Sequence, residues 1–468
     1  MRKSRIADYF HLKFVGKTVS LLGFGREGKS SYRTLRYFLP DLKIIISDSS
    51  HQCIDEFANE FGTDPNVRFC CGEDYLNPLY QSDIIIKSPG VSLKLLTDSE
   101  ILSKITSQTE IFLELFRDQV IGVTGTKGKS TTVSLLYQIL RNADRDVLLG
   151  GNIGKPPLDF LDKISPDSLL VFEMSSHQLE NIKVSPKVAV LLNIFQEHLD
   201  HYKSYRYYQL AKYNIARWQK PGDIFIWNGE SEILRELLSE FLTESEQMVI
   251  HCKPGDKAGA RCNDDNLYID DGSGEICFEN FCKRRKLPGK HNLTNILAAG
   301  LAAYIKGVDP EIIRITTETF DGLPHRLEFI GERNGVRYYN DSISTIPEST
   351  IEALKTFPDT HTLLLGGFDR GVDYSALVSY LKNHPVNRIL FIGKAGLRIA
   401  KELFHSDELS EAMIFQDFES TVKAAIGITP AGAICLLSPA AASYDMFKNF
   451  EHRGEKFRQM ILDKDPPA

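Results

Sequence analysis

The residues at 123–132 constrain the fold of this chain more than any other stretch. They read Val-Thr-Gly-Thr-Lys-Gly-Lys-Ser-Thr-Thr, and an apolar run at 119–124 leads into them. Such a run predicts a buried parallel strand, and apolar Leu135, Leu136 and Ile139 predict a helix after the glycines. Glycines between a strand and a helix let backbone N–H groups surround an anion, which the helix N-terminus also attracts. The stretch therefore predicts a phosphate-binding loop.

The residues after the glycines indicate which phosphate compound this loop binds. Lys129 is placed to reach the outer phosphates of a nucleoside triphosphate, and the hydroxyl of Ser130 or Thr131 to bind Mg²⁺. The full motif has a glycine five residues before Gly128, where this chain has Val123, so the loop is a shortened variant. Glycine-rich turns also occur without phosphate, but Lys-Ser-Thr at this offset favours triphosphate binding.

Length and charge exclude several other classes of protein. At 468 residues the chain is too long for one hydrophobic core, so we expect two to four domains. A net charge of −7 gives no reason to expect nucleic acid or an anionic membrane as a partner. The N-terminus lacks the apolar core of a signal peptide, and no window approaches transmembrane length. Eight cysteines without a Cys-x-x-Cys pair predict reduced thiols and a cytoplasmic location.

The first segment contains a second glycine motif. Gly23, Gly25 and Gly28 match G-x-G-x-x-G after an apolar strand, and Asp48 ends the next strand twenty residues later. This is the dinucleotide fingerprint, in which glycines approach a pyrophosphate and the acid binds a ribose hydroxyl. Alone it indicates NAD or FAD, although any nucleotide diphosphate suits the same loop. Residues 1–107 are predicted to form a Rossmann-like domain.

Polar side chains follow two apolar strands of the second segment. Glu173, Ser175 and Ser176 follow one strand, and Glu197 and His198 follow the next. Because ligands bind beyond the carboxyl ends of parallel strands, we expect these side chains to converge on the phosphate loop. Each residue alone is equally well explained as a solvated or capping residue at a strand end.

Two features complete the second segment, which is predicted to end at residue 322. Residues 266–278 have the pattern of a β-hairpin. An alanine-rich helix follows, and Asn292 and Asn295 lie near its start. Their amides are candidates for contact with a base or a phosphate; helix capping is the simpler explanation.

A third α/β segment begins near residue 322. A hairpin turning at 333–335 precedes three strands that each end in a loop of small residues, at 361–370, 388–394 and 434–440. A last helix is predicted from about Tyr444 past Phe457. These elements predict another parallel α/β domain over 323–468.

Together these motifs resemble the Mur ligase family, which builds the peptide of bacterial cell-wall precursors. The resemblance covers the whole chain in order, and the segment at 447–454 is most similar to the members that add D-glutamate. It rests on residues 125–131, 151–154, 173–180, 197–200, Lys212, 291–295, 322–326, 340–342 and 437–443.

The resemblance implies an α/β protein of three domains. These are a Rossmann-like N-terminal domain for a UDP-linked substrate (1–107), a central P-loop ATPase-like parallel-sheet domain for ATP (108–322), and a C-terminal Rossmann-like α/β domain for an amino acid (323–468). The implied activity is ATP-dependent addition of D-glutamate to UDP-N-acetylmuramoyl-L-alanine through an acyl phosphate, in cytoplasmic peptidoglycan precursor synthesis. ATP and two Mg²⁺ ions are the implied cofactors. A monomer that acts on small molecules, without nucleic acid or membrane insertion, is expected.

The resemblance also assigns roles to individual residues. The implied ATP-binding residues are Gly125, Thr126, Lys127, Gly128, Lys129, Ser130, Thr131, Asn292, Asn295, Arg326 and Asp341. The implied UDP-substrate residues are Gly25, Arg26, Glu27, Asp48, Ser49, Asn152 and His198, and the implied amino-acid pocket contains Thr345, Arg370, Ser443 and Phe450. The implied metal site contains Ser130, Glu173, His198 and Lys212, of which Lys212 matches a lysine that bears a carbamate in relatives. The implied catalytic residues are Lys129, His198 and Lys212.

Three positions depart from the family pattern. Glu197 stands where relatives usually have Asp, which leaves a supporting role for a carboxylate intact. Ile343 stands where relatives often have Lys, so one cation near the reacting groups is lost. Arg370 replaces a Lys found in some relatives, and its guanidinium would bind a glutamate carboxylate through two hydrogen bonds.

Several alternatives remain open from the sequence. An NAD-dependent oxidoreductase explains Gly23 to Asp48 but leaves the phosphate loop and Arg326 without a use. Ile343 raises the alternative of a non-catalytic UDP-sugar-binding protein. Within the family, addition of L-alanine is an alternative, whereas the Rossmann-like first domain argues against folate glutamylation.

Overall fold

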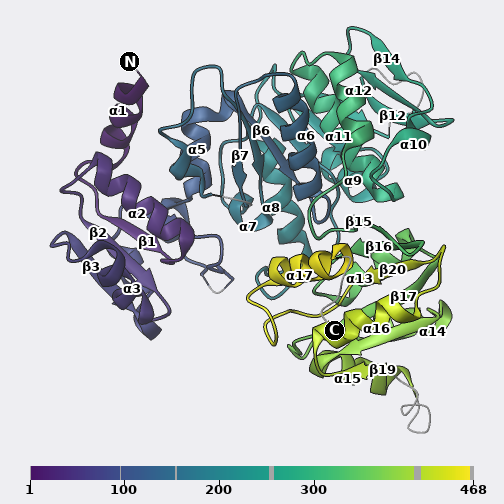
Figure 1. Cartoon of the computed structure of the whole chain (residues 1–468). Coiled ribbons are helices and arrows are strands. Elements are labelled where there is room, and N and C mark those ends of the chain that lie inside the picture. Colours follow the sequence, from purple (N-terminus) through teal and green to yellow (C-terminus); the bar gives the residue numbers. More distant parts are fainter. Residues whose placement is uncertain (1, 95, 153–154, 252–257, 405–412, 464–468) are drawn as a thin grey trace. The chain divides into compact units, whose positions relative to one another are not determined.

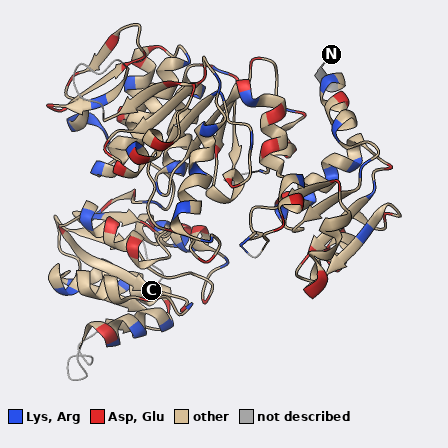
Figure 2. Cartoon of the chain, turned by 180° about the vertical axis from the view of Figure 1, so that it is seen from behind, with Lys and Arg blue, Asp and Glu red and all other residues tan. Residues whose placement is uncertain are grey.

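The structure, a computed structural model, describes residues 2–94, 96–152, 155–251, 258–404 and 413–463 (Figure 1). Its contacts divide the chain into two compact units, Met1–Arg285 with His291–Thr319, and Lys286–Lys290 with Phe320–Ala468. The first unit contains a five-stranded and a nine-stranded sheet, and the second contains a six-stranded sheet. The predicted α/β class is confirmed. Positive and negative side chains are interspersed along both units (Figure 2).

The first sheet of unit 1 is entirely parallel, with the strand order β3-β2-β1-β4-β5. Its strands read as near-continuous apolar runs because both faces are buried beneath helices. The exception is β3, whose Arg68, Cys70 and Cys71 make it read as polar, so the sequence did not predict it. The elements are α1 (Arg2–Phe14), β1 (Val19–Leu22), α2 (Arg26–Phe38), β2 (Ile44–Asp48), α3 (Gln52–Phe61), β3 (Val67–Cys71), β4 (Ile84–Lys87), α4 (Ser99–Lys104) and β5 (Ile105–Thr106).

The second sheet of unit 1 has the order β14-β13-β12-β11-β10-β9-β6-β8-β7. Strands β12 to β14 are antiparallel to their neighbours within this group, which confirms the predicted hairpin at 266–278. The strands are β6 (Val120–Thr124), β7 (Val147–Gly151), β8 (Leu169–Glu173), β9 (Val188–Leu191), β10 (Ile224–Asn228), β11 (Glu246–Ile250), β12 (Gly259–Asn263), β13 (Asn266–Asp270) and β14 (Glu275–Phe278). The helices include α5 (Gln108–Phe116), α6 (Lys129–Asn142), α7 (Ser176–Leu179), α8 (Tyr205–Arg217), α9 (Glu232–Glu240), α10 (Phe281–Arg284), α11 (Lys290–Ile305) and α12 (Pro310–Thr319).

The order of this sheet brings three strand ends together. Strand β6 lies between β8 and β9, with Val123 opposite Glu173 and Thr124 opposite Leu191. All five residues of β6 are buried, as expected for a central parallel strand. The carboxyl ends of β8 and β9 therefore flank the loop that leaves β6, where ligands of parallel sheets bind.

Unit 2 contains a sheet of order β15-β16-β20-β17-β18-β19, in which only the β15–β16 pairing is antiparallel. The predicted last helix was wrong in its start, because α17 begins at Phe450, where the side chain of Asn449 accepts the N–H of His452. The elements are β15 (Glu328–Arg333), β16 (Val336–Asn340), α13 (Pro347–Thr356), β17 (Thr360–Gly366), α14 (Ser375–Asn383), β18 (Arg388–Ile392), α15 (Gly393–Leu403), β19 (Met413–Phe415), α16 (Phe418–Ile428), β20 (Ile434–Leu437) and α17 (Phe450–Leu462). Over the described ranges, no helix has the length and apolar character needed to cross a membrane.

Candidate active site

The loop between β6 and α6 has the geometry of a phosphate-binding loop. Gly128 has a φ of +88° and caps α6, which begins at Lys129. The ammonium group of Lys129 lies inside the loop and donates to the carbonyl oxygens of Gly125 (2.9 Å) and Thr126 (3.0 Å). A cation therefore lies beside the N-terminus of a 14-residue helix, and both attract the negative charge of a polyphosphate.

The segment after β9 supports this loop from one side. The Thr126 hydroxyl lies 2.9 Å from the hydroxyl of Tyr208 and accepts the N–H of Phe195 at 2.8 Å. Asn193 accepts the Lys127 N–H (2.9 Å) and donates to the Lys127 carbonyl (3.1 Å). Asn193 thus occupies the N–H groups of Thr126 and Lys127, and together with the Thr126 side chain it holds the loop in shape.

The two asparagines of α11 lie against the same loop. Asn295 donates to the Asn292 side chain at 2.9 Å and accepts the Thr132 hydroxyl at 3.2 Å. A Cβ atom on Gly128 would come within 2.3 Å of the Asn295 side-chain oxygen. The structure therefore brings Asn292 and Asn295, two candidates for contact with a base or a phosphate, to the phosphate loop.

We expect Gly128→Ala to weaken nucleotide binding by at least about tenfold and to destabilise the protein by about 1–3 kcal/mol. Alanine is strained at a φ of +88°, and its Cβ would also displace Asn295. Gly222→Ala is the matched control, because Gly222 has a φ of +81° with nothing within 4 Å of an added Cβ. Nucleotide affinity and the melting temperature Tm are the measurements. Equal nucleotide affinity in the two variants would show that the contact with Asn295 is unimportant.

Glu173 connects the phosphate loop to the end of β8. Its side chain is buried, and its two oxygens accept the Ser130 hydroxyl (2.7 Å) and the Asn152 amide (2.8 Å). Hydroxyl and carboxylate oxygens are the ligand types that Mg²⁺ prefers. Of the other residues in the 151–154 motif, Ile153 and Gly154 lie outside the described part of the chain.

The described residues offer few protein ligands, which suits Mg²⁺ better than a metal ion that is coordinated entirely by protein side chains. Among them, no three His, Cys, Asp or Glu side chains are grouped as a metal site. Mg²⁺ commonly retains several waters and binds through one or two carboxylates together with substrate phosphates. Glu173 and Ser130 beside a phosphate loop match that pattern.

Lys212 lies on α8 beneath the loop and is only 2% exposed. Its amine donates to the Gly125 carbonyl at 2.8 Å and lies 5.0 Å from the centre of the Tyr208 ring. Burial, and then the positive charge of Lys129, hold the pKa of Lys212 well below its usual value. An amine in this position favours its neutral, nucleophilic form.

His198 lies in the loop after β9, with a φ of +58° and a half-exposed side chain. Its Nε2 is 3.8 Å from Glu197, which also pairs with Lys127 at 2.6 Å. Burial lowers the pKa of His198 below its ordinary value of 6.5, although the Glu197 carboxylate opposes that shift. The neutral imidazole needed for metal binding is therefore the favoured form near neutral pH.

If neutral His198 is required, we expect the acid limb of kcat/KM to lie below pH 6.5, with a plateau above it. A lowered pKa means that the imidazole stays neutral until the pH falls below 6.5. The adjacent His177 does not titrate in this window, because burial lowers its pKa to about 4. The test is a pH profile from 5 to 8 at saturating Mg²⁺, with exposed His384→Gln as control. A limb centred above pH 6.5 would contradict the assignment.

A buried polar cluster beside His198 was missed by the sequence analysis. The Glu180 carboxylate forms a salt bridge with the Lys87 ammonium at 3.2 Å and lies 3.4 Å from Nε2 of His201. Lys87 ends β4 of the first sheet and is 3% exposed, and the ring of His177 lies 4.2 Å from that of His201. The sequence 173–180 was recognised as a motif, but only its first acid was given a role. Pairing between Lys87 and Glu180 depends on tertiary contacts that have no local signal.

The glycine turn of the first sheet uses Asp48 for its own structure. The two Asp48 oxygens accept the N–H groups of Phe24 (2.7 Å) and Ser50 (2.8 Å). Gly28 is required because a Cβ there would come within 2.3 Å of the Gly23 carbonyl oxygen. Asp48 is therefore less available to a ribose hydroxyl, whether of NAD or of a UDP-linked substrate, than the dinucleotide fingerprint predicts.

The other residues predicted to bind the UDP-linked substrate surround this turn. Gly25 caps α2, and Gly25, Arg26 and Ser49 are exposed. Glu27 is largely buried, accepts the Gln178 amide at 2.8 Å, and its pKa is raised by burial. Gln178 lies in α7, the short helix that follows β8 of the second sheet. Its hydrogen bond to Glu27 therefore connects the glycine turn to the region of Glu173.

In unit 2, the predicted amino-acid residues lie on loops at the ends of β16, β17 and β20 and at the start of α17. Arg370 is exposed and donates to the Thr345 carbonyl at 3.1 Å. Ser443 is buried, and Phe450 begins α17, where its carbonyl accepts the Ser342 hydroxyl at 2.8 Å. Thr345 and Arg370 are thus brought together directly.

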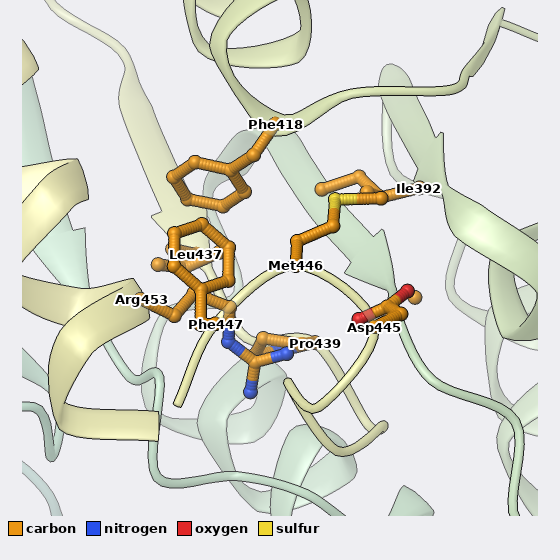
Figure 3. Close-up of a pocket in the computed structure, with 10 residues that line it drawn as sticks. Ile392, Phe418, Leu437, Pro439, Asp445, Met446, Phe447 and Arg453 are labelled. Carbon is orange, nitrogen blue, oxygen red and sulfur yellow. The ribbon is translucent and has the colours of Figure 1, made fainter. Parts of the chain in front are cut away.

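Arg453, which the sequence analysis gave no role, connects these loops. It is buried and donates to the Ser342 hydroxyl (3.0 Å), the Ser342 carbonyl (2.9 Å) and the carbonyls of Ala441 (3.0 Å) and Ala442 (3.2 Å). Figure 3 shows it beside Asp445 at a small pocket of about 10 Å³, which has room for about one water molecule. This pocket is too small for an amino acid. Arg453 therefore has a structural role here, in which its hydrogen bonds connect the loops.

Asp341 and Arg326, predicted to contact ATP, also lie in unit 2. Asp341 accepts the Leu327 N–H (3.2 Å) and the Ser438 hydroxyl (2.7 Å), and burial raises its pKa to about 6. His325 and Leu327 flank Arg326 with φ values of +63° and +46°. Left-handed backbone at two residues that are not glycine is costly and is often found at functional sites.

Comparison with known proteins adds to this geometry. Residues 123–303 match the Mur ligase middle domain. A UDP-N-acetylmuramoylalanine–D-glutamate ligase of Acetivibrio thermocellus is 35% identical over 463 residues, covering 97% of this chain and 97% of that protein. A protein of the same name from Clostridium kluyveri is 36% identical over 424 residues, covering 88% of this chain and 89% of that protein. The crystal structure of MurF from Acinetobacter baumannii has a similar fold, with a TM-score of 0.58 at 17% identity over 97% of this chain and 92% of that one.

Proposed function

Because this chain belongs to the Mur ligase family and is an ATP-dependent ligase of peptidoglycan synthesis, we propose that it joins D-glutamate to UDP-N-acetylmuramoyl-L-alanine. ADP and phosphate are the other products. The observation that carries this proposal is the convergence of Lys129, Ser130 and Glu173 on one phosphate loop. Similarity to D-glutamate ligases over nearly the whole chain supports the choice of amino acid.

The reaction requires a carboxylate to be activated. The alanine carboxylate of the acceptor is a poor electrophile, so ATP converts it to an acyl phosphate that the D-glutamate amine then attacks. Two anions must approach each other in the first step, and positive charge at the phosphates lowers that barrier. Lys129 and the N-terminus of α6 supply this charge, and Mg²⁺ adds to it when bound.

We assign the remaining residues to the two ends of this reaction. Gly125, Thr126, Lys127, Gly128, Thr131, Asn292 and Asn295 of unit 1 bind ATP, and the family resemblance also gives Arg326 and Asp341 an ATP-binding role. Ser130, Glu173, His198 and Lys212, the last as a carbamate, would hold two Mg²⁺ ions. Gly25, Arg26, Glu27, Asp48 and Ser49 hold the UDP end of the acceptor, and Asn152 and His198 its muramoyl-alanine end. The three domains are 1–107, 108–322 and 323–468, and the protein acts as a cytoplasmic monomer.

Arg370 is the proposed anchor of the D-glutamate carboxylate, with Thr345, Ser443 and Phe450 in the same pocket. We expect Arg370→Ala to raise the KM for D-glutamate by about tenfold or more, because a bidentate charged pair is lost. The KM for ATP should change by less than about twofold. Arg388→Ala, which removes an exposed arginine at the start of β18, is the control. Equal rises in both KM values would mean that the pocket is misassigned.

A phosphate-release assay tests the function as a whole. The purified protein, Mg²⁺, ATP and UDP-N-acetylmuramoyl-L-alanine are combined with D-glutamate, L-glutamate or L-alanine. We expect phosphate release with D-glutamate, and a new amide bond detected by mass spectrometry. UDP-N-acetylmuramate with L-alanine tests the alternative family activity. If no phosphate is released with either acceptor, the result would favour a non-catalytic UDP-sugar-binding protein, the alternative that Ile343 raises.

A further inference from the structure

Four of the cysteines form two close pairs. The Sγ atoms of Cys53 and Cys71 are 2.9 Å apart, and those of Cys262 and Cys282 are 2.7 Å apart. A disulfide bond measures about 2.0 Å, so each pair would bond after a movement of less than about 1 Å. All four are free thiols in the structure.

The other described cysteines have different surroundings. Cys70 donates to the Asp74 carbonyl at 3.3 Å, Cys435 is fully buried in the core of unit 2, and Cys277 is exposed on β14. Close sulfur contacts are thus specific to the two pairs among the part of the chain that the structure describes. These three cysteines serve as internal controls.

The first pair joins the two ends of a loop beside the glycine turn. Cys53 lies in the first turn of α3, and Cys71 is the last residue of β3, directly opposite Asp48 of β2. The β2–α3 loop therefore begins next to Cys71 and ends next to Cys53. A bond between the two would hold this loop, which contains Asp48 and Ser49, at both ends.

The second pair lies at the antiparallel end of the second sheet. Cys262 is on β12 and Cys282 is on α10, where the Cys282 N–H donates to the Asp265 carbonyl at 2.9 Å. Both thiols are partly exposed. A small reagent therefore has access to this pair.

We propose that Cys53–Cys71 and Cys262–Cys282 are two reversible disulfide sites, which close by exchange with a low-molecular-weight disulfide. In each exchange one thiolate attacks the small disulfide and releases one small thiol. The second thiolate then attacks the mixed disulfide and releases the other. Each pair thus loses two protons and two electrons, and the small disulfide is reduced to two thiols.

Burial sets the rate of this chemistry. It raises the pKa of the Cys53 thiol above its ordinary value and that of Cys262 to about 12, and the neighbouring thiol contributes in both cases. Because the thiolate is the nucleophile, exchange is slow at neutral pH and accelerates as the pH rises. The pairs therefore behave as sites that respond to sustained oxidation.

Closure of the first pair should change nucleotide binding, a consequence that rests on the proposed function. The β2–α3 loop carries the two residues assigned to the uridine end of the acceptor. Fixing both ends of the loop while pulling Cys53 toward Cys71 alters the position of Ser49. We expect the affinity for UDP to change by about fivefold between the reduced and oxidised protein.

The test uses the full-length protein in mixtures of reduced and oxidised glutathione. After alkylation of free thiols, peptide mass spectrometry should find Cys53 linked to Cys71 and Cys262 linked to Cys282, while Cys70, Cys277 and, after unfolding, Cys435 are alkylated. Reduction should restore all thiols. Glutathione attached to single cysteines without an internal bond, or random pairing that includes Cys277, would overturn the proposal.

Serine variants separate the two sites and the two claims. Cys53→Ser should abolish only the first bond and Cys262→Ser only the second, with Cys71→Ser and Cys282→Ser as replacements if either variant fails to fold. UDP affinity, measured by calorimetry, should depend on oxidation in the native protein and in Cys262→Ser, but not in Cys53→Ser. Bond formation is read by mass and does not require ligase activity, so its outcome is independent of the proposed function. An unchanged UDP affinity after closure of the first pair would overturn the link to nucleotide binding.

Discussion

Replacing Lys129 with alanine is expected to abolish ligation, with kcat lower by about three orders of magnitude or more. Lys129 is the first residue of α6, and its ammonium lies within the loop beside the carbonyls of Gly125 and Thr126. Loss of one preorganised group that stabilises developing charge costs about 10²–10³-fold in other enzymes. Lys129 is a full charge at the point where two anions meet, so the larger value is expected.

The control for this experiment is Lys187→Ala. Lys187 is exposed and precedes β9, at the opposite end of the strand from the phosphate loop. Phosphate release and binding of a non-hydrolysable ATP analogue are measured for both variants. Lys129→Ala should lose turnover and much of its nucleotide affinity, while Lys187→Ala should match the native protein. Ligation retained in Lys129→Ala would refute this loop as the site of phosphoryl transfer.

The parts of this site that the sequence predicted share a local signal. The phosphate loop needs only a buried strand, glycines and a helix, and these lie within 20 residues of one another. The position of Glu173 followed from one general property of parallel sheets, because the carboxyl ends of β6 and β8 are adjacent. Asn292 and Asn295 had a weaker signal, their place near the start of a predicted helix, and the family resemblance then assigned them to ATP.

The parts that were missed depend on contacts between distant segments. Lys87 is buried against the partly exposed Glu180 although 93 residues separate them, and neither is unusual in its own segment. Asp48 matched a ligand-binding motif, yet its oxygens are used by Phe24 and Ser50. Arg453 was read as part of a motif, but only the fold shows that its guanidinium reaches Ser342 and Ala441. Sequence patterns therefore fail to predict charged residues whose partners lie far away in the sequence.

Lys212 is expected to act as a carbamate. Its amine is buried, its pKa is well below the ordinary value, and it lies near the positive charges of Lys129 and Lys127. A neutral amine attacks CO₂ to form a carbamate and releases a proton, so the uncharged side chain becomes negatively charged. A negative group there is favoured by the same two lysines that disfavour an ammonium ion, and it adds an oxygen ligand for Mg²⁺.

Substitutions at Lys212 distinguish a carbamate from an ammonium ion. Lys212→Met keeps the length of the side chain without either charge and should lower kcat by about two to three orders of magnitude. Lys212→Arg keeps a cation, whereas Lys212→Glu supplies a carboxylate, so a carbamate predicts that Glu retains more activity than Arg or Met. A cationic role predicts the reverse order. In the native protein, ¹³C-bicarbonate should give a carbamate NMR signal that is absent from Lys212→Met, and full activity in CO₂-free buffer without that signal would exclude the modification. Because the Arg side chain is positive and the Glu side chain is negative, loss of packing alone cannot produce the predicted order.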